Sequence, residues 1–396
     1  MPDSTNAKNI ARFESDLHGL KSIPDPMPSA RAALSNATRI CLLGGNSALS
    51  RLGYGGLIAE AYGGDKEIVV VDDTVAKCDL PFKTDSILST SRFAEWAAHG
   101  DSQGALAVNL ATQLFSFFFF AGLLEQTKEV MELPLPQVSN ATVYETAVQT
   151  RELSLRRLPE YVELARMLAD SFSLETLFAV LKMRVGMDHR EVFPVQCSWE
   201  DEYFSIFPNG REVTFSLGED EIFVDVGAYD GDTIRKFLTA THGRYSAIHA
   251  FEPDKRNFAA LAGGALRGFP RLSMHRAVVS DARGAIGFTE RPDSASSHVQ
   301  DAGETTISAV RLDDEIETCT FIKMDVEGHE AKVLRGARRL LRESRPRLAI
   351  TCYHYADDLL EIAGLIKDIN PLYRLRLRHH GGYYQDSVLY ADCPEC

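Results

Sequence analysis

The sequence predicts an α/β protein built from two α/β units that a helical segment connects. Short apolar runs of strand length alternate with helical stretches in residues 37–140 and again after residue 201. Residues 372–391 follow a different pattern, in which Tyr and Leu alternate with Arg ahead of the pair Gly381-Gly382. Alternation with a period of two, followed by a glycine turn, indicates an antiparallel hairpin. We therefore expect the second unit to end in a hairpin.

The composition narrows the class of protein. The chain has 396 residues and a formal net charge of −14 at pH 7, and its length suits two or three domains. An acidic chain is poorly matched to a polyanion, so we expect no nucleic-acid partner. The cysteines are scattered and odd in number, which favours reduced thiols in a cytoplasmic protein. Cys393 and Cys396 form a lone C-x-x-C, whereas a zinc site would need a second pair.

Neither a signal peptide nor a membrane span is expected. The N-terminus lacks a basic segment followed by an apolar one. The most apolar stretch covers residues 114–124 and is much shorter than the roughly 20 residues that a membrane-spanning helix needs. We interpret it as a buried core helix.

The first 140 residues are predicted as an N-terminal extension, residues 1–36, and a Rossmann-like α/β domain, residues 37–140. Strands are expected in RICLLGG, EIVVVDD and GALAVNL, at residues 39–45, 67–73 and 104–110. The turn after the first strand does not give G-x-G-x-x-G, since Gly44 and Gly45 are adjacent, and Asp72 lies rather far along for a ribose-binding acid. A nucleotide or nucleotide-sugar site stays open here, beside the scaffold or dimerisation role that we favour.

Residues 141–200 are predicted as a helical connector without strands. Apolar residues recur at helical spacing between Leu153 and Leu168, and a second helix is expected over residues 174–183. Such a segment suits a lid or the surface of a homo-oligomer.

Residues 201–396 carry five further strand patterns before the terminal hairpin. These are EIFVDVG, YSAIHAFEP, LSMHRAVVS, CTFIKMDVEG and RLAITCYH, at residues 221–227, 245–253, 272–280, 319–328 and 347–354. Five such strands followed by an antiparallel hairpin outline the Rossmann-like sheet of class I methyltransferases. We expect this sheet in the C-terminal domain.

The first of these strands ends in the segment that is richest in chemistry, EIFVDVGAYDGDT. The strand stops at Asp225, and a turn through Gly227 and Gly231 would bring backbone N–H groups close to a ligand. The acids Asp225, Asp230 and Asp232 would repel a phosphate, and the spacing fits neither dinucleotide nor P-loop motifs. S-adenosylmethionine fits, because it has a sulfonium and an amino group and no phosphate.

Two acids at later strand ends complete this cofactor prediction. Glu252 is placed to accept hydrogen bonds from both ribose hydroxyls, because ligands of open α/β sheets bind at the carboxyl ends of the strands. Asp281 lies where an adenine edge is expected and could accept from its amine, but it is equally well a turn acid.

The fourth and fifth strand ends supply candidates for catalysis. Asp325 is placed to hold the methionine moiety or to orient a substrate hydroxyl, and a divalent metal held by Asp325, Glu327 and a histidine is an open alternative. His354 is the preferred general base for an acceptor hydroxyl, and His329 is the second choice. The polar stretch of residues 291–314 suits either a polyhydroxyl substrate or an exposed loop. Its polar candidates are Ser294, Ser296, Ser297, His298 and Thr305.

Four motifs in order resemble the FkbM family of S-adenosylmethionine-dependent methyltransferases. They are FVDVGAYDGDT, AFEPD, AVVSDARG and IKMDVEGHE, and the resemblance covers about residues 203–390. It implies S-adenosylmethionine as cofactor and O-methylation of a hydroxyl on a sugar, polyketide or related glycoconjugate. The N-terminal unit resembles the Rossmann-like regions fused to sugar-modifying enzymes.

The resemblance also implies a set of site residues. Asp225, Gly227 and Gly231 would line the methionine pocket, and Asp325 would lie by the methyl-transfer centre. The full cofactor-binding set is Asp225, Gly227, Ala228, Tyr229, Gly231, Thr233, Glu252, Val278, Asp281 and Asp325, with His354, Asp325 and His329 as catalytic candidates and no metal site assigned.

We therefore expect an O-methyltransferase that acts on a small-molecule or glycan acceptor. Two alternatives remain. The chain could be a nucleotide-sugar or dinucleotide-binding protein centred on the N-terminal domain, or a non-catalytic scaffold that binds S-adenosylmethionine.

Overall fold

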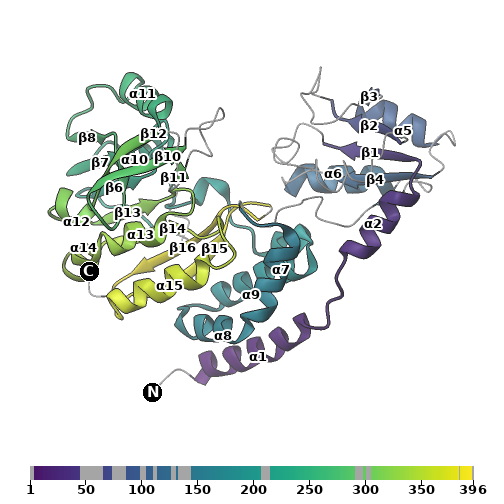
Figure 1. Ribbon diagram of the computed structural model, residues 1–396, viewed down its shortest axis with the longest axis horizontal. Coiled ribbons are helices and arrows are strands. Elements are labelled where there is room, and N and C mark those ends of the chain that lie inside the picture. Colours follow the sequence, from purple (N-terminus) through teal and green to yellow (C-terminus); the bar gives the residue numbers. More distant parts are fainter. Residues whose placement is uncertain are drawn as a thin grey trace.

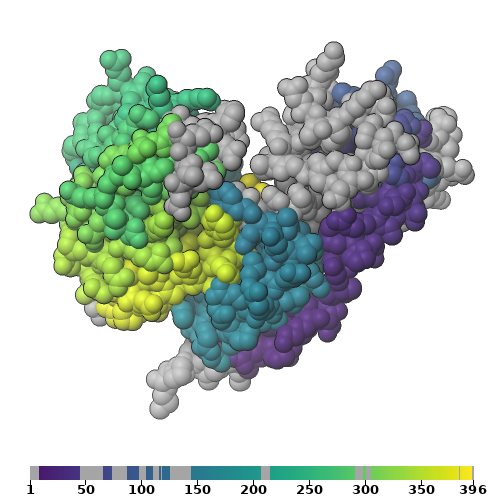
Figure 2. Space-filling view, in the orientation of Figure 1, coloured from purple at the N-terminus to yellow at the C-terminus, as the bar shows by residue number. Residues whose placement is uncertain are grey.

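Two sheets of mainly parallel strands organise the chain, and Figure 1 shows them as two lobes joined by helices. The computed structural model describes residues 4–44, 66–73, 86–98, 104–109, 114–125, 131–132, 144–206, 215–289, 298–299, 305–382 and 384–394. The α/β class and the C-terminal hairpin expected from the sequence are confirmed. Figure 2 shows the C-terminal lobe in green and yellow and the N-terminal lobe in purple and blue.

The N-terminal sheet has the strand order β3-β2-β1-β4-β5, and all of its pairs are parallel. Its strands are β1 (Arg39–Leu43), β2 (Glu67–Val71), β3 (Ser86–Leu88), β4 (Ala105–Asn109) and β5 (Met131–Glu132), with helices α2 (Met27–Asn36), α5 (Thr90–Ala98) and α6 (Leu114–Glu125). The sequence indicated β1, β2 and β4. The strands β3 and β5 are too short to leave a pattern. The Gly45 turn lies outside the described residues.

Helix α6 differs from its prediction as a fully buried helix. Its residues Phe120, Leu123 and Leu124 are buried in the N-terminal core, but Phe118 and Phe119 are exposed by 59% and 48%. The helix therefore packs with one side only, although its sequence is apolar all round. Within the described residues, none of the helices combines the length and apolar character needed to cross a membrane.

The connector consists of three α-helices and two short 3₁₀ helices. They are α7 (Ala147–Arg156), α8 (Leu158–Met167), α9 (Ser171–Gly186), η1 (His189–Val195) and η2 (Trp199–Asp201). The single helix expected between Leu153 and Leu168 is broken into two, because Pro159 occupies the first turn of α8, where its missing N–H is tolerated.

Helix α9 is apolar on two faces because it lies between the two lobes. Leu177 and Leu181 belong to a core that α1 (Ser4–Leu20), α8 and the C-terminal domain share. Val180 and Met183 belong to the core of the N-terminal sheet. A helix that is apolar all round is typically buried from both sides, so the connector belongs to the cores of both lobes.

The C-terminal sheet has seven strands in the order β15-β16-β14-β13-β6-β7-β8. They are β6 (Ile222–Val226), β7 (Ala247–Phe251), β8 (Leu272–His275), β13 (Phe321–Met324), β14 (Arg347–Thr351), β15 (Arg374–His379) and β16 (Ser387–Asp392). Strand β16 is antiparallel to both β14 and β15, and the other pairs are parallel. This is the class I methyltransferase sheet that the sequence predicts. The strand order reverses between β6 and β13, which is where ligands of open α/β sheets bind.

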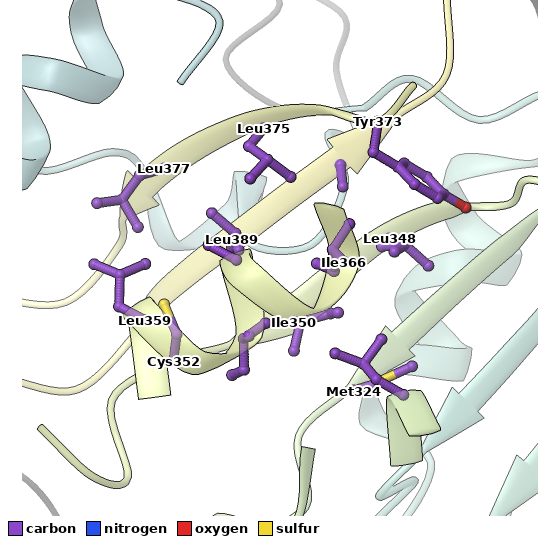
Figure 3. Close-up of a cluster of buried hydrophobic side chains, with 14 of the residues drawn as sticks. Met324, Leu348, Ile350, Cys352, Leu359, Ile366, Tyr373, Leu375, Leu377 and Leu389 are labelled. Atoms are coloured by element: carbon purple, nitrogen blue, oxygen red, sulfur yellow. The ribbon is translucent and has the colours of Figure 1, made fainter. Parts of the chain in front are cut away.

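Six helices accompany this sheet. They are α10 (Asp232–Ala240), α11 (Lys255–Gly263), α12 (Leu312–Glu315), α13 (Glu330–Arg335), α14 (Arg338–Glu343) and α15 (Asp358–Ile369). Figure 3 shows how Leu359 and Ile366 of α15 face Ile350, Leu375 and Leu389 of the sheet, all of which are buried. This packing fixes the hairpin against the rest of the domain.

A second, small sheet interrupts the domain and was not expected. Its strands β9 (Val278–Val279), β10 (Gly284–Thr289), β11 (His298–Val299) and β12 (Thr305–Val310) pair in the order β11-β10-β12-β9. The single strand predicted over residues 272–280 is therefore two strands in different sheets. His298 and Thr305 lie in β11 and β12, whereas Ser294, Ser296 and Ser297 lie outside the described residues.

Candidate functional site

A cavity of about 380 Å³ lies at the carboxyl ends of β6, β7 and β13, where the strand order reverses. Its volume falls within the range of small-molecule sites, roughly 300–1,000 Å³. Ten residues singled out in the sequence line it, namely Gly227, Tyr229, Asp232, Thr233, Glu252, Val278, His298, Asp325, Glu327 and His329. The structure thus brings together residues spread over about a hundred positions of the chain, because three adjacent strands end at one edge.

Five other candidates lie near the cavity but do not line it. Asp225, Ala228 and His354 are completely buried behind its wall. Gly231 begins helix α10 with a φ of 88°, and Asp281 is exposed beyond β9. These five residues shape or border the cavity. Because none of them lines it, we assign them no direct contact with a ligand inside it.

The turn after β6 requires glycine at position 227 for a steric reason. Gly227 has a φ of 80°, and a Cβ atom added there would lie 1.8 Å from the carbonyl oxygen of Asp325. The turn therefore passes directly against the end of β13. This close approach lets backbone atoms of the β6 turn and the Asp325 side chain face the same cavity.

Asp225 is paired inside the protein. Its Oδ1 lies 3.3 Å from the Nζ of Lys323, and that ammonium also donates to the carbonyl of Gly227 at 2.7 Å. Burial raises the pKa of Asp225 to about 6. Burial alone would lower the pKa of Lys323, but Asp225, Asp325 and Asp232 raise it above its usual value. Lys323 therefore stays charged and holds the turn after β6 through its hydrogen bond to Gly227.

Glu252, at the end of β7, is held with its carboxylate in the cavity wall. The backbone N–H of Tyr229 donates to its Oε2 and the N–H of Asp254 to its Oε1, both at 2.8 Å. Its side chain is buried, and burial raises the pKa of Glu252 to about 7 in spite of these two donors. A carboxylate fixed in this way can accept further hydrogen bonds from a vicinal diol.

The end of the cavity near β9 combines apolar and polar groups. Val278 and Val279 line it, and His329 closes it with its Nε2 at 3.0 Å from the Oγ of Ser280. Burial lowers the pKa of His329 to about 4, so its ring is neutral at pH 7. The Ser280 contact places His329 beside β9, at the end where the sequence predicts the adenine.

Four ionisable groups, a histidine and three acids, converge at the other end of the cavity, after β13 and β14. His354 Nε2 lies 3.5 Å from Asp325 Oδ1 and 3.7 Å from Glu327 Oε2, while its Nδ1 lies 3.3 Å from Glu330 Oε1. Burial alone would lower the pKa of His354, but these three acids raise it to about 10. The imidazole of the protein alone is therefore protonated at neutral pH, which argues against His354 as a general base in that state.

Several lining residues were missed in the sequence. Lys323 lies inside the motif IKMDVEGHE and could have been found there. Trp199 lies in η2 at the end of the connector, Glu202 and Tyr203 directly follow it, and Asp386 precedes β16, where no local pattern marks a site. The Tyr203 hydroxyl donates to Asp325 Oδ2 at 3.2 Å, so a residue just after the connector orients a predicted site residue.

The cavity suits a cationic ligand. Its charged lining is predominantly acidic, with the carboxylates Glu202, Asp232, Glu252, Asp325, Glu327 and Asp386 against the single described ammonium of Lys323. S-adenosylmethionine carries a sulfonium and an amino group together with a ribose diol. The lining therefore fits this cofactor: Glu252 would accept from the ribose diol, and the acidic lining as a whole would favour the cationic groups.

Comparison with known proteins gives the same assignment for the C-terminal half. Residues 225–375 match the model of the methyltransferase FkbM domain. A crystal structure of methyltransferase FkbM from Methylobacillus flagellatus KT aligns with a TM-score of 0.70 and 25% sequence identity, covering 98% of this chain and 100% of that one. The similarity therefore extends over both lobes and the connector.

A curated relative is the hexuronic acid methyltransferase AglP of Haloferax volcanii. It is 29% identical over 131 residues, which are 31% of this chain and 53% of the relative. The match thus spans about half the length of that protein.

Proposed function

We propose that this chain methylates a hydroxyl group of a sugar, glycoconjugate or related metabolite, on the premise that its C-terminal half is an S-adenosylmethionine-dependent methyltransferase domain of the FkbM family. The premise follows from the family match, the strand order of the sheet and the similarity to a solved structure of this family. The observation that carries the proposal is the acid-lined cavity at the reversal of strand order, with Glu252 fixed in its wall.

When bound, S-adenosylmethionine supplies an activated methyl group. The chain contributes mainly position. Glu252 would accept the ribose hydroxyls, Gly227, Tyr229 and Thr233 would border the methionine part, and Val278 would pack against the adenine, since all five line the cavity. Asp325 faces the region where the acceptor hydroxyl meets the methyl group, and it is oriented by the Tyr203 hydroxyl.

A sugar acceptor is supported by the relative and by the aromatic lining. AglP is named for methylation of hexuronic acid. In this chain Trp199 lines the cavity and is 74% exposed, and Tyr203 and Tyr353 also line the cavity. Flat aromatic faces pack against the apolar faces of sugar rings, and an exposed indole at a cavity often marks a binding surface.

We also propose a reducing, cytoplasmic location. The described cysteines are all free thiols, namely Cys41, Cys197, Cys319, Cys352 and Cys393. Free thiols in this number are typical of compartments that keep cysteine reduced.

A methyl-transfer assay tests the proposed activity. The full chain is incubated with methyl-labelled S-adenosylmethionine and a panel of neutral sugars, hexuronic acids and non-sugar alcohols. We expect label on a sugar and a mass gain of one methylene group, and little transfer by Glu252→Gln. A folded protein that binds the cofactor but labels only non-sugar alcohols would contradict the sugar acceptor.

A further inference from the structure

The three groups at the end of β13 and β14 lie at the spacing of metal ligands. One ligand atom each from Asp325, Glu327 and His354 lies within 4.8 Å of the others. The distances from His354 Nε2, 3.5 and 3.7 Å, are too long for hydrogen bonds. Two atoms bound to one cation at about 2.1 Å lie roughly 3.0–3.4 Å apart. The two distances from His354 Nε2 are within a few tenths of an ångström of that value.

His354 provides an independent indication of a ligand. Its side chain is completely buried, and among the described residues neither ring nitrogen has a hydrogen-bond partner. A buried polar group without such a partner is costly and needs an explanation. Its Nε2 is directed at the two carboxylates that line the cavity, so a cation between them would satisfy the ring nitrogen.

The surroundings of the three groups also match those of a metal site. A metal-bound histidine usually directs its other ring nitrogen at a carboxylate. Here Nδ1 of His354 faces Glu330, whose Oε1 accepts from the N–H of Val326 at 2.9 Å and lies 3.2 Å from the Thr351 hydroxyl.

Two tyrosines orient the carboxylates. The hydroxyl of Tyr203 contacts Asp325 Oδ2 at 3.2 Å, and the hydroxyl of Tyr144 contacts Glu327 Oε2 at 3.4 Å. The Thr351 hydroxyl also donates to Asp325 Oδ1 at 3.3 Å, so both carboxylates are held from outside the cluster, while Oδ1 lies 3.5 Å from His354 Nε2.

We propose that Asp325, Glu327 and His354 bind a divalent cation, Mn²⁺ or Mg²⁺, which holds the acceptor hydroxyl beside the methyl group. The ligand set of two carboxylates and one imidazole suits such a cation. Asp325 and Glu327 line the cavity while His354 lies behind them, so the remaining coordination positions face the cavity. The role in catalysis rests on the proposed function; the binding of the cation does not.

The cation would activate the acceptor hydroxyl as a nucleophile. Coordination lowers the pKa of a hydroxyl, so the acceptor can lose its proton to water near neutral pH. The oxygen then attacks the methyl carbon, a C–O bond forms and the C–S bond breaks. The products are the methyl ether, S-adenosylhomocysteine and one proton, with no change of oxidation state at the cation.

Two isosteric variants in the same cavity separate cation binding from cofactor binding. Mn²⁺ binding to the full chain is followed by electron paramagnetic resonance, and S-adenosylhomocysteine binding by calorimetry. We expect Glu327→Gln to weaken Mn²⁺ at least tenfold and to weaken S-adenosylhomocysteine, which lacks the sulfonium, much less than Glu252→Gln does, because Glu327 is assigned no ribose contact. Glu252→Gln should do the reverse, which makes it the matched control. Addition of EDTA should abolish methyl transfer by the wild type.

Two results would overturn the metal site. One is a wild-type protein that binds S-adenosylhomocysteine but no Mn²⁺, and the other is Glu327→Gln binding Mn²⁺ as tightly as the wild type. In both cases the methyltransferase proposal stands. A folded wild type that binds Mn²⁺ but no S-adenosylhomocysteine would overturn the proposed function and leave the cation site in place.

Discussion

At the scale of a single residue, the protonation state of Glu252 makes the affinity for the cofactor depend on pH. Burial raises its pKa to about 7, and only the ionised form can accept from two ribose hydroxyls. A raised carboxylate pKa means that the acceptor form is lost as the pH falls through 7. We expect S-adenosylmethionine to bind roughly tenfold more weakly at pH 6 than at pH 8.

Calorimetric titrations at pH 6, 7 and 8 measure this dependence. In Glu252→Gln the affinity should be low at all three values, because glutamine does not titrate. An equally steep pH dependence in this variant would assign the titration to another group.

The buried pair of Asp225 and Lys323 is expected to matter for stability. The sequence singled out Asp225 as a cofactor ligand, whereas the structure places it behind the cavity wall against Lys323. Replacing Lys323 by Met leaves a buried carboxylate without its cation, and we expect a loss of roughly 3–5 kcal/mol in the free energy of unfolding. Urea denaturation measures it.

The double variant Asp225→Asn with Lys323→Met is the control. It removes both charges and should recover much of the stability that Lys323→Met loses. If Lys323→Met alone unfolds at the same urea concentration as the wild type, the pair does not hold the β6 turn.

At the scale of elements, the turn after β6 depends on its contact with β13. A Cβ at Gly227 would meet the Asp325 carbonyl, whereas at Gly243, with a φ of 71°, it would meet nothing within 4 Å. Both alanine variants carry the cost of a left-handed backbone, about 1–2 kcal/mol. Only Gly227→Ala adds the clash, typically a further 1–3 kcal/mol.

The difference in stability between these two variants measures the cost of the clash with the Asp325 carbonyl. We expect Gly227→Ala to unfold at a clearly lower denaturant concentration than Gly243→Ala. Equal stabilities would mean that the β6 turn moves away from β13 at little cost.

The elements that the sequence predicts are those with strong local patterns. Apolar runs ending in acids and glycines marked β6, β7, β13 and β14, and alternation marked the terminal hairpin. Strands β10 to β12 were missed because β11 has only two residues and half of the residues of β10 and of β12 are Gly, Thr or Ser, which leaves no apolar run. The break between α7 and α8 was foreseeable from Pro159 alone.

The candidate site was predictable in part for the same reason. Glu252 and Gly227 stand in motifs, and both line the cavity. Tyr203 and Asp386 reach the cavity only because the connector and the hairpin fold back onto the sheet. The burial of Asp225 and His354 depends on packing from several elements, which no local pattern reports.

At the scale of the whole molecule, the connector protects the edge of the C-terminal sheet. Strand β15 is the edge strand, and the connector satisfies part of its backbone. The N–H of Ala169 donates to the Leu375 carbonyl, and the N–H of Cys197 to the His379 carbonyl, both at 2.8 Å. Uncovered edge strands tend to pair with other chains.

We therefore expect the C-terminal domain to need its connector. A fragment of residues 201–396 exposes the β15 edge and the apolar side chains that Leu177 and Leu181 cover. It should aggregate or bind a hydrophobic dye more strongly than residues 144–396, which keep the connector on β15 although they expose the face of α9 that packs on the N-terminal sheet. Gel filtration and dye fluorescence of both fragments check this, and a stable monomer of residues 201–396 would contradict it.

From this packing we propose where the domains begin and end. The C-terminal domain would extend functionally into residues 141–200, with α1 packed on the connector. The similarity to the Methylobacillus flagellatus structure over both lobes supports treating the chain as one assembly.

The central claim is that the C-terminal cavity binds S-adenosylmethionine through Glu252. Isothermal titration of the full chain with S-adenosylhomocysteine tests it most directly. We predict one site per chain, with an affinity that Glu252→Ala weakens at least tenfold. No binding by a folded wild-type protein, or equal affinity in the variant, would contradict the account.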